Sequence, residues 1–196
     1  MTGHDSSSSI RNLEGDPHLT LSVLVVDDHE PWRREIRWVL RQSRRWKIVG
    51  EAGDGVEAIE KAGALEPDLI LLDVGLPGMN GIETARRILA LTPDARILFV
   101  SAHRTLDIVE VAFATGARGY VLKDDAGHEL LPAMSAVIEG KRFVSATLTG
   151  RSVDGTTERQ HPPRPRHEVG FYSDDSRLVE AYTLFARAAL DAPDEP

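Results

Sequence analysis

Short apolar runs alternate along the chain with longer segments in which apolar residues recur every three or four positions. Continuous or β-branched runs predict strands, and the longer spacing predicts amphipathic helices. The predicted strands are SVLVV (22–26), KIVGEA (47–52), DLILLD (68–73), ARILFVS (95–101) and GYVLK (119–123). The predicted helices lie at 27–43, 55–65, 81–91, 105–117 and 125–140. Pro31 suits the first turn of the first helix.

This alternation predicts the fold class. Five strand–helix pairs within about 120 residues call for a parallel sheet with right-handed crossovers. We therefore expect an α/β domain of flavodoxin-like topology, a doubly wound five-stranded parallel sheet in the order 2-1-3-4-5 flanked by five helices. The run LILL (69–72) has no polar position, as expected of a strand buried on both faces.

The ends of the chain lack this alternation. Residues 1–20 are rich in Ser, Gly and Asp and are predicted to form a disordered tail. The α/β domain is expected to span 21–145, because the alternation stops at Phe143. Residues 146–167 are polar and contain several prolines, which predicts a linker.

A strand–helix tail is predicted at 168–191, before a disordered end at 192–196. The apolar residues of its helix are Val179, Tyr182, Leu184 and Phe185. One strand and one helix cannot bury a core of their own. This tail is therefore expected to pack on something else, to dimerise or to stay partly disordered.

Composition excludes several classes of site. The chain has no cysteine, which rules out disulfides, thiolate metal sites and cysteine nucleophiles. No apolar run approaches the roughly 18 residues that a membrane span needs, and the N-terminus lacks the apolar core of a signal peptide, so a cytoplasmic protein is expected. The net charge of −8 argues against broad binding of nucleic acid, which depends on clustered Lys and Arg. We expect direct contact with neither nucleic acid nor membrane.

Reactive side chains gather at the carboxyl ends of four predicted strands. They are Asp27 and Asp28, Asp73, Ser101, and Lys123. Ligands of doubly wound sheets bind at this edge, and clustered carboxylates suit Mg²⁺. A bound cation would keep Asp73 ionised and nucleophilic toward a phosphoryl group, with Lys123 and Ser101 placed to stabilise its oxygens. A lone Asp after a strand is more often a cap or turn former, but five such residues together favour a functional site.

Four motifs together resemble the receiver domains of two-component response regulators, which have the CheY-like fold. The motifs are VLVVDDHE (23–30), LILLDVGLPGMNG (69–81), ILFVSAH (97–103) and GARGYVLKDDAGHELLPAM (116–134). The resemblance covers residues 21–145. The first and last motifs are most similar to the subfamily usually joined to a LuxR-type helix-turn-helix.

The resemblance implies a phosphorylation site. Asp73 would accept phosphate from the phosphohistidine of a sensor histidine kinase, while Lys123 and Ser101 contact the phosphoryl group. Asp28 would be the more direct Mg²⁺ ligand of the acidic pair. The full implied ligand set comprises the carboxylates of Asp27, Asp28 and Asp73 and the backbone carbonyl of Gly75.

The resemblance also implies a conformational switch. Tyr120 matches the aromatic residue that turns inward as Ser101 moves, although spacing alone predicts a half-buried strand aromatic. Pro77 and Gly81 would shape the loop beneath Asp73. Family members often carry Pro after the site lysine, whereas this chain has Asp124, which removes the expectation of a cis-proline.

The output of the switch is harder to predict. LTGRS (148–152) faintly resembles the opening of a LuxR-type DNA-binding domain, but the further helices and basic turn of such a domain do not follow it, so we reject this interpretation. Residues 166–192 instead resemble the first strand and helix of a MEDS sensory domain, in which a His-containing strand leads into FYSDD.

Three functions are compatible with the sequence. The preferred one is a phosphoreceiver that signals through protein contacts without its own DNA-binding domain. The second is a truncated LuxR-type transcription regulator whose output domain is missing. The third, a metal-dependent phosphatase, is disfavoured because such enzymes place a second Asp two residues after the nucleophile, where this chain has Gly75. No enzymatic activity beyond slow self-dephosphorylation is expected, and the expected partners are a sensor histidine kinase and an unidentified downstream protein, with homodimerisation an open alternative.

Overall fold

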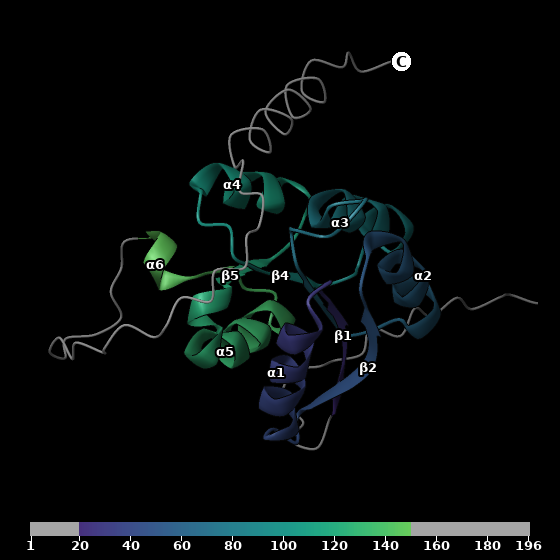
Figure 1. The fold of residues 1–196 in the computed structure, drawn as a ribbon, viewed down its shortest axis with the longest axis horizontal. Helices are drawn as coiled ribbons and strands as arrows, with labels where there is room; N and C mark the ends of the chain where they lie inside the picture. Colours follow the sequence, from purple (N-terminus) through teal and green to yellow (C-terminus); the bar gives the residue numbers. More distant parts are fainter. Residues whose placement is uncertain (1–19, 150–196) are drawn as a thin grey trace, which may run out of the picture.

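The structure is a computed structural model that describes residues 20–149. In this part of the chain six parallel strands form one sheet in the order β2-β1-β3-β4-β5-β6 (Figure 1). The strands are β1 (Leu21–Val26), β2 (Trp46–Ala52), β3 (Leu69–Leu72), β4 (Ile97–Ser101), β5 (Gly119–Leu122) and β6 (Phe143–Val144). The helices are α1 (Glu30–Arg41), α2 (Gly55–Leu65), α3 (Gly81–Leu91), α4 (Leu106–Ala114), α5 (Ala126–Ile138) and α6 (Ala146–Thr149), with a 3₁₀ turn at Lys123–Asp125. The predicted doubly wound fold and the order of the first five strands are confirmed.

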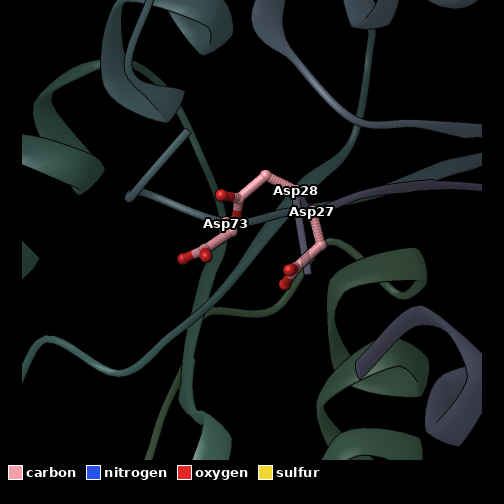
Figure 2. A group of neighbouring side chains, drawn as sticks. All are labelled: Asp27, Asp28 and Asp73. Atoms are coloured by element: carbon pink, nitrogen blue, oxygen red, sulfur yellow. The ribbon is translucent and has the colours of Figure 1, made fainter. Parts of the chain in front are cut away.

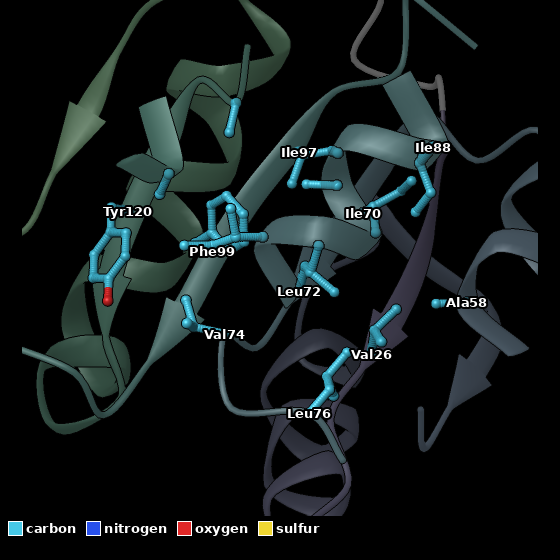
Figure 3. Close-up of a cluster of buried hydrophobic side chains, with 14 of the residues drawn as sticks. Val26, Ala58, Ile70, Leu72, Val74, Leu76, Ile88, Ile97, Phe99 and Tyr120 are labelled. Carbon is cyan, nitrogen blue, oxygen red and sulfur yellow. The ribbon is translucent and has the colours of Figure 1, made fainter. Parts of the chain in front are cut away.

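Helices cover both faces of the sheet, with α2, α3 and α4 on one face and α1 and α5 on the other (Figure 1). Successive residues of a strand point to opposite faces, so Leu24 and Val26 join the core cluster beneath α2–α4, whereas Val23 and Val25 join the one beneath α1 and α5. Figure 3 shows part of the first cluster. Every residue of β3, β4 and β5 is buried, which explains the continuous apolar runs in the sequence.

Side-chain caps start two of the helices that follow strands. The Asp54 carboxylate accepts the backbone N–H of Glu57 at 2.9 Å at the start of α2, and the Asn80 side chain accepts that of Glu83 at 3.0 Å at the start of α3. Each cap satisfies a donor that the first helical turn leaves without a partner. Among residues 20–149 no helix is long and apolar enough to cross a bilayer.

A sixth strand and a short helix extend the predicted domain. Phe143 pairs with Gly119 and Val144 with Tyr120, and α6 occupies the first four residues of the segment predicted to be a linker. A two-residue strand is too short to show a period in the sequence, and its position depends on the edge of β5 that it meets. The described residues leave out 1–19 of the disordered tail predicted at 1–20, 150–167 of the predicted linker, the strand–helix tail predicted at 168–191 and the disordered end predicted at 192–196.

Buried polar groups attach this extension to the rest of the fold. The Ser145 hydroxyl donates to the Glu129 carboxylate of α5 and accepts the backbone N–H of Leu122 at 2.9 Å. The same carboxylate accepts the N–H of Ala146 at 3.1 Å, and the N–H of Ser145 donates to the Tyr120 carbonyl at 3.0 Å. Ser145 and Glu129 are both buried, so these bonds replace water that neither group can reach.

The Ser145→Ala variant is expected to lower the free energy of unfolding by about 1–3 kcal/mol, because it leaves a buried carboxylate oxygen and a backbone N–H without partners. Urea unfolding measures the change. Thr147→Ala in the exposed part of α6 is the control and is expected to shift the value by no more than about 0.5 kcal/mol. A Ser145→Ala value as small as the control value would contradict the anchoring role of Ser145.

Candidate functional site

Three carboxylates meet at the carboxyl end of the sheet (Figure 2). Asp27 and Asp73 directly follow Val26 and Leu72, which pair across β1 and β3, so the register of two neighbouring strands places both acids side by side. Carboxylate oxygens of Asp27, Asp28 and Asp73 lie within 4.8 Å of one another. Asp27 and Asp73 are buried, whereas Asp28 is exposed. The parallel topology therefore assembles the predicted acidic cluster.

The Lys123 ammonium bridges the two buried acids. Its Nζ lies 2.7 Å from Asp27 Oδ2 and 2.7 Å from Asp73 Oδ2. Lys123 follows β5, which β4 separates from β3, so its long side chain reaches across β4 to the acids. One positive charge thus contacts two negative charges where water is largely excluded, and the ammonium offsets part of their mutual repulsion.

The pKa of Lys123 and the pKa of Asp27 are both raised, the first by neighbouring charges and the second mainly by burial. Burial alone would lower the pKa of Lys123, but the charges of Asp73 and Asp27 and the bonds to them outweigh it and raise the pKa above the usual 10.5. Burial raises the pKa of Asp27 above its usual 3.8; Lys123 opposes this effect and Asp73 adds to it. Lys123 therefore stays protonated at neutral pH, and the charged form of Asp27 depends on nearby cations.

Backbone N–H groups orient both buried carboxylates. The N–H of His29 donates to Asp27 Oδ1 at 2.9 Å, and the N–H of Gly75 donates to Asp73 Oδ1 at 3.2 Å. Each bond spans two residues, so each acid is held by the loop that immediately follows it. The Arg33 guanidinium also donates to the Asp27 carbonyl, which connects the first turn of α1 to the acidic pair.

Gly81 lets the chain pass directly beneath Asp73. Its N–H donates to the Val74 carbonyl at 2.9 Å, and a Cβ placed at Gly81 would lie 1.9 Å from the Asp73 carbonyl oxygen. No residue other than glycine fits that approach. The structure places Pro77 in the exposed part of the same loop and Gly75 beside Asp73 through its N–H; the role of the Gly75 carbonyl as a metal ligand stays a prediction.

Ser101 and Tyr120 are both bonded to His103, in the loop between β4 and α4. The Ser101 hydroxyl accepts the N–H of His103 at 3.4 Å, while the Tyr120 hydroxyl donates to the His103 carbonyl at 2.9 Å. Tyr120 is fully buried, with its ring centroid 6.2 Å from that of Phe99 (Figure 3). The ring therefore points into the core, whereas spacing alone predicted a half-buried strand aromatic.

Two residues of the site, Trp32 and His103, are not predicted by the sequence. The centroid of the Trp32 indole ring in α1 lies 5.5 Å from Lys123 Nζ, and the helical spacing of apolar residues gives no sign of this contact. His103 supplies the backbone partners of Ser101 and Tyr120, and its Nε2 lies 3.8 Å from where a Cβ at Gly75 would be. His103 stands inside the motif ILFVSAH, but nothing in that pattern indicates which of its atoms are used.

The donor set fits a small divalent cation. All three side chains offer carboxylate oxygens, the hard ligands that Mg²⁺ and Ca²⁺ prefer, and these oxygens already lie close together. The exposed Asp28 leaves one side of the cluster open to solvent, as a cation that keeps several waters requires. Asp27, Asp28 and Asp73 could therefore hold a metal ion.

The acidic cluster and Lys123 lie together at the carboxyl edge of a doubly wound sheet, as the resemblance to receiver domains led us to expect. Residues 23–135 match the family model of the response regulator receiver domain, and this match covers more than half of the chain. The chain belongs to that family and contains the receiver domain of a two-component response regulator.

Relatives agree with this assignment. The nitrate/nitrite response regulator protein NarL of Escherichia coli (strain K12) is 36% identical over 154 residues, covering 74% of this chain and 71% of NarL. DevR/DosR of Mycobacterium tuberculosis, a DNA-binding transcriptional activator, is 37% identical over 145 residues, covering 72% of this chain and 67% of that protein. A crystal structure of a LuxR-family two-component response regulator from Aurantimonas sp. SI85-9A1 superposes with a TM-score of 0.65 at 33% identity, covering 67% of this chain and 94% of that one.

The Lys123→Met variant is expected to lose about 3 kcal/mol of unfolding free energy at pH 7, because two buried carboxylates lose their shared cation. The loss is expected to shrink as the pH falls. The pKa of Asp27 in the folded state already lies above its usual 3.8, and the loss of Lys123 raises it further. As the pH falls, Asp27 of the folded variant therefore becomes neutral at a pH where Asp27 of the unfolded chain is still charged. This protonation removes the unpaired buried charge and with it part of the stability loss.

Urea unfolding at several pH values measures this dependence. Lys141→Met, which removes a lysine from an exposed ion pair with Glu139, is the control and is expected to leave the unfolding free energy nearly unchanged at every pH, because solvent screens that pair. A Lys123→Met deficit that stays constant between neutral and acidic pH would refute the electrostatic explanation.

Proposed function

We propose that this receiver is a phosphoacceptor, phosphorylated on Asp73 by a sensor histidine kinase with Mg²⁺, and that it signals through protein–protein contacts. The observation that carries the proposal is the Lys123 ammonium, held 2.7 Å from the carboxylate of Asp73 beside the acidic pair. The Lys123 ammonium is close enough to Asp73 to offset the negative charge that a transferred phosphoryl group would add there. The proposed metal ligands are the carboxylates of Asp27, Asp28 and Asp73 and the backbone carbonyl of Gly75.

In the proposed reaction Asp73 Oδ attacks the phosphorus of a phosphohistidine. A P–O bond to Asp73 forms, the P–N bond breaks, and the electron pair of that bond returns to the imidazole, which takes up a proton. Lys123 pairs with the phosphoryl oxygens, and Ser101 donates a hydrogen bond to them. A bound Mg²⁺ supplies further charge neutralisation at those oxygens.

The switch follows from the shared attachment of Ser101 and Tyr120 to His103. If the Ser101 hydroxyl turns toward a phosphoryl group, its bond to the His103 N–H is lost, and the loop that also anchors the Tyr120 hydroxyl is free to change. On this proposal, phosphorylation shifts a balance between existing states of the loop and raises the population of one of them.

The proposal does not include an enzymatic role. Gly75 offers no side chain two residues after Asp73 that could serve as a general acid or base. Hydrolysis of the aspartyl phosphate is then expected to be limited to slow self-dephosphorylation.

Incubation with acetyl phosphate and Mg²⁺ is expected to add one phosphoryl group to the full chain, detected by intact-mass spectrometry. Asp73→Asn should abolish the addition because it removes the nucleophilic oxygen, and Asp28→Asn or chelation of Mg²⁺ should reduce it. Asp94→Asn, at an exposed loop position, is the matched control and should label like the native chain. Undiminished labelling of Asp73→Asn would refute the assignment.

The proposed output predicts no sequence-specific DNA binding by this chain. A gel-shift assay of the phosphorylated protein on a fragment that contains its own promoter is expected to show only binding that competitor DNA and added salt remove, in keeping with the net charge of −8. A phosphorylation-dependent shift that resists competitor would favour the alternative, a truncated LuxR-type transcription regulator.

A further inference from the structure

An aromatic ring contacts the bridging ammonium of the site. Lys123 Nζ lies over the Trp32 indole, 5.5 Å from the ring centroid, while it is also 2.7 Å from each of two carboxylates. Trp32 is half-buried and packs against the core cluster beneath α1 and α5. The ammonium thus has carboxylates as hydrogen-bond partners and the face of an indole as a further neighbour.

The backbone of Trp32 is held by groups that also orient Asp27 of the acidic pair. The N–H of Trp32 donates to the His29 carbonyl at 3.0 Å, and the N–H of His29 donates to Asp27 Oδ1 at 2.9 Å. The next residue, Arg33, bonds to the Asp27 carbonyl through its guanidinium. The backbone that carries the indole is therefore held in the same turn as the backbone of Asp27, one of the two acids that Lys123 contacts.

The face of an indole attracts an ammonium without accepting its hydrogen bonds directionally. Such a contact keeps the ammonium near the ring and leaves its N–H groups free to donate hydrogen bonds to oxygen acceptors. This property suits Lys123, whose ammonium must remain near Asp73 as the acceptor changes from a carboxylate oxygen to phosphoryl oxygens. A leucine of similar burial would keep the apolar packing of the site and lose the attraction.

We propose that Trp32 is a positioning residue that holds the Lys123 ammonium at Asp73 during phosphoryl transfer. The inference rests on the proposed phosphoacceptor function and adds a residue that acts on the reaction through Lys123. Trp32 also becomes a reporter of the reaction, since movement of the ammonium changes the environment of its ring.

The positions of the other two tryptophans allow a fluorescence change to be assigned to Trp32. The chain has three tryptophans, of which Trp38 lies on the outer side of α1 with 66% of its surface exposed and Trp46 is buried at the start of β2 with Arg45 5.4 Å from its ring centroid. Neither Trp38 nor Trp46 contacts Lys123, Asp27 or Asp73 in any interaction described above. A fluorescence change on phosphorylation is therefore expected to disappear when Trp32 alone is replaced.

The experiment compares Trp32→Leu, Trp32→Phe and the control Trp38→Leu in the full chain. With acetyl phosphate and Mg²⁺, Trp32→Leu is expected to slow phosphoryl incorporation about two- to fivefold, the range of an exposed to partly buried cation–π contact. Trp32→Phe should recover part of the rate, because phenyl retains a weaker attractive face, and Trp38→Leu should react like the native chain. Native and Trp38→Leu proteins should change their fluorescence on phosphorylation, and both Trp32 variants should not.

The results that overturn the proposal are distinguishable. If the native chain takes up no phosphoryl group, the proposed function fails and this inference fails with it. If the native chain is phosphorylated but Trp32→Leu reacts at the native rate, only the role of Trp32 fails. If Trp32→Phe is as slow as Trp32→Leu, the aromatic face does not matter and the positioning role is refuted; a fluorescence change that survives in both Trp32 variants likewise refutes the movement of Lys123 against this ring.

Discussion

The contact of one ammonium with two buried carboxylates is the interaction on which the rest of the site depends. Asp27 and Asp73 lie at the ends of apolar strands with little access to water, where two like charges would otherwise repel each other strongly. Lys123 offsets that repulsion from the turn that follows β5, a strand that pairs with neither β1 nor β3. The same ammonium lies 2.7 Å from Asp73 and is the counter-charge that the proposed phosphoryl group would need.

A rigid scaffold makes this close arrangement possible. β3, β4 and β5 are buried on both faces, so the residues at their ends are carried by backbone that two layers of helices hold in place. Beneath Asp73 the chain turns back so tightly that only glycine fits at position 81. The loops above this scaffold have little freedom next to the acids, because the N–H groups of His29 and Gly75 donate to the carboxylates of Asp27 and Asp73, two residues earlier in the chain.

A short hydrogen-bonded path connects the site with the end of the described chain. Tyr120 bonds through its hydroxyl to the His103 loop and through its carbonyl to Ser145. Ser145 in turn bonds to Leu122, next to Lys123, and to the buried Glu129. The strand that carries Tyr120 and precedes Lys123 is thus the strand to which β6 is attached, so a change in β5 would act directly on β6 and α6.

The sequence by itself determined the alternation of strands and helices, the strand order expected of such a chain, and the acids, hydroxyl and amine at the strand ends. These features are local, since period, apolar content and the residue after a strand can be read within a dozen positions. Only the tertiary structure decided that β6 exists, that Ser145 meets Glu129, that Tyr120 points inward and that Trp32 lies over Lys123. Each of these depends on residues that are distant in the chain and adjacent only after the sheet has formed, so no local pattern encodes the contact.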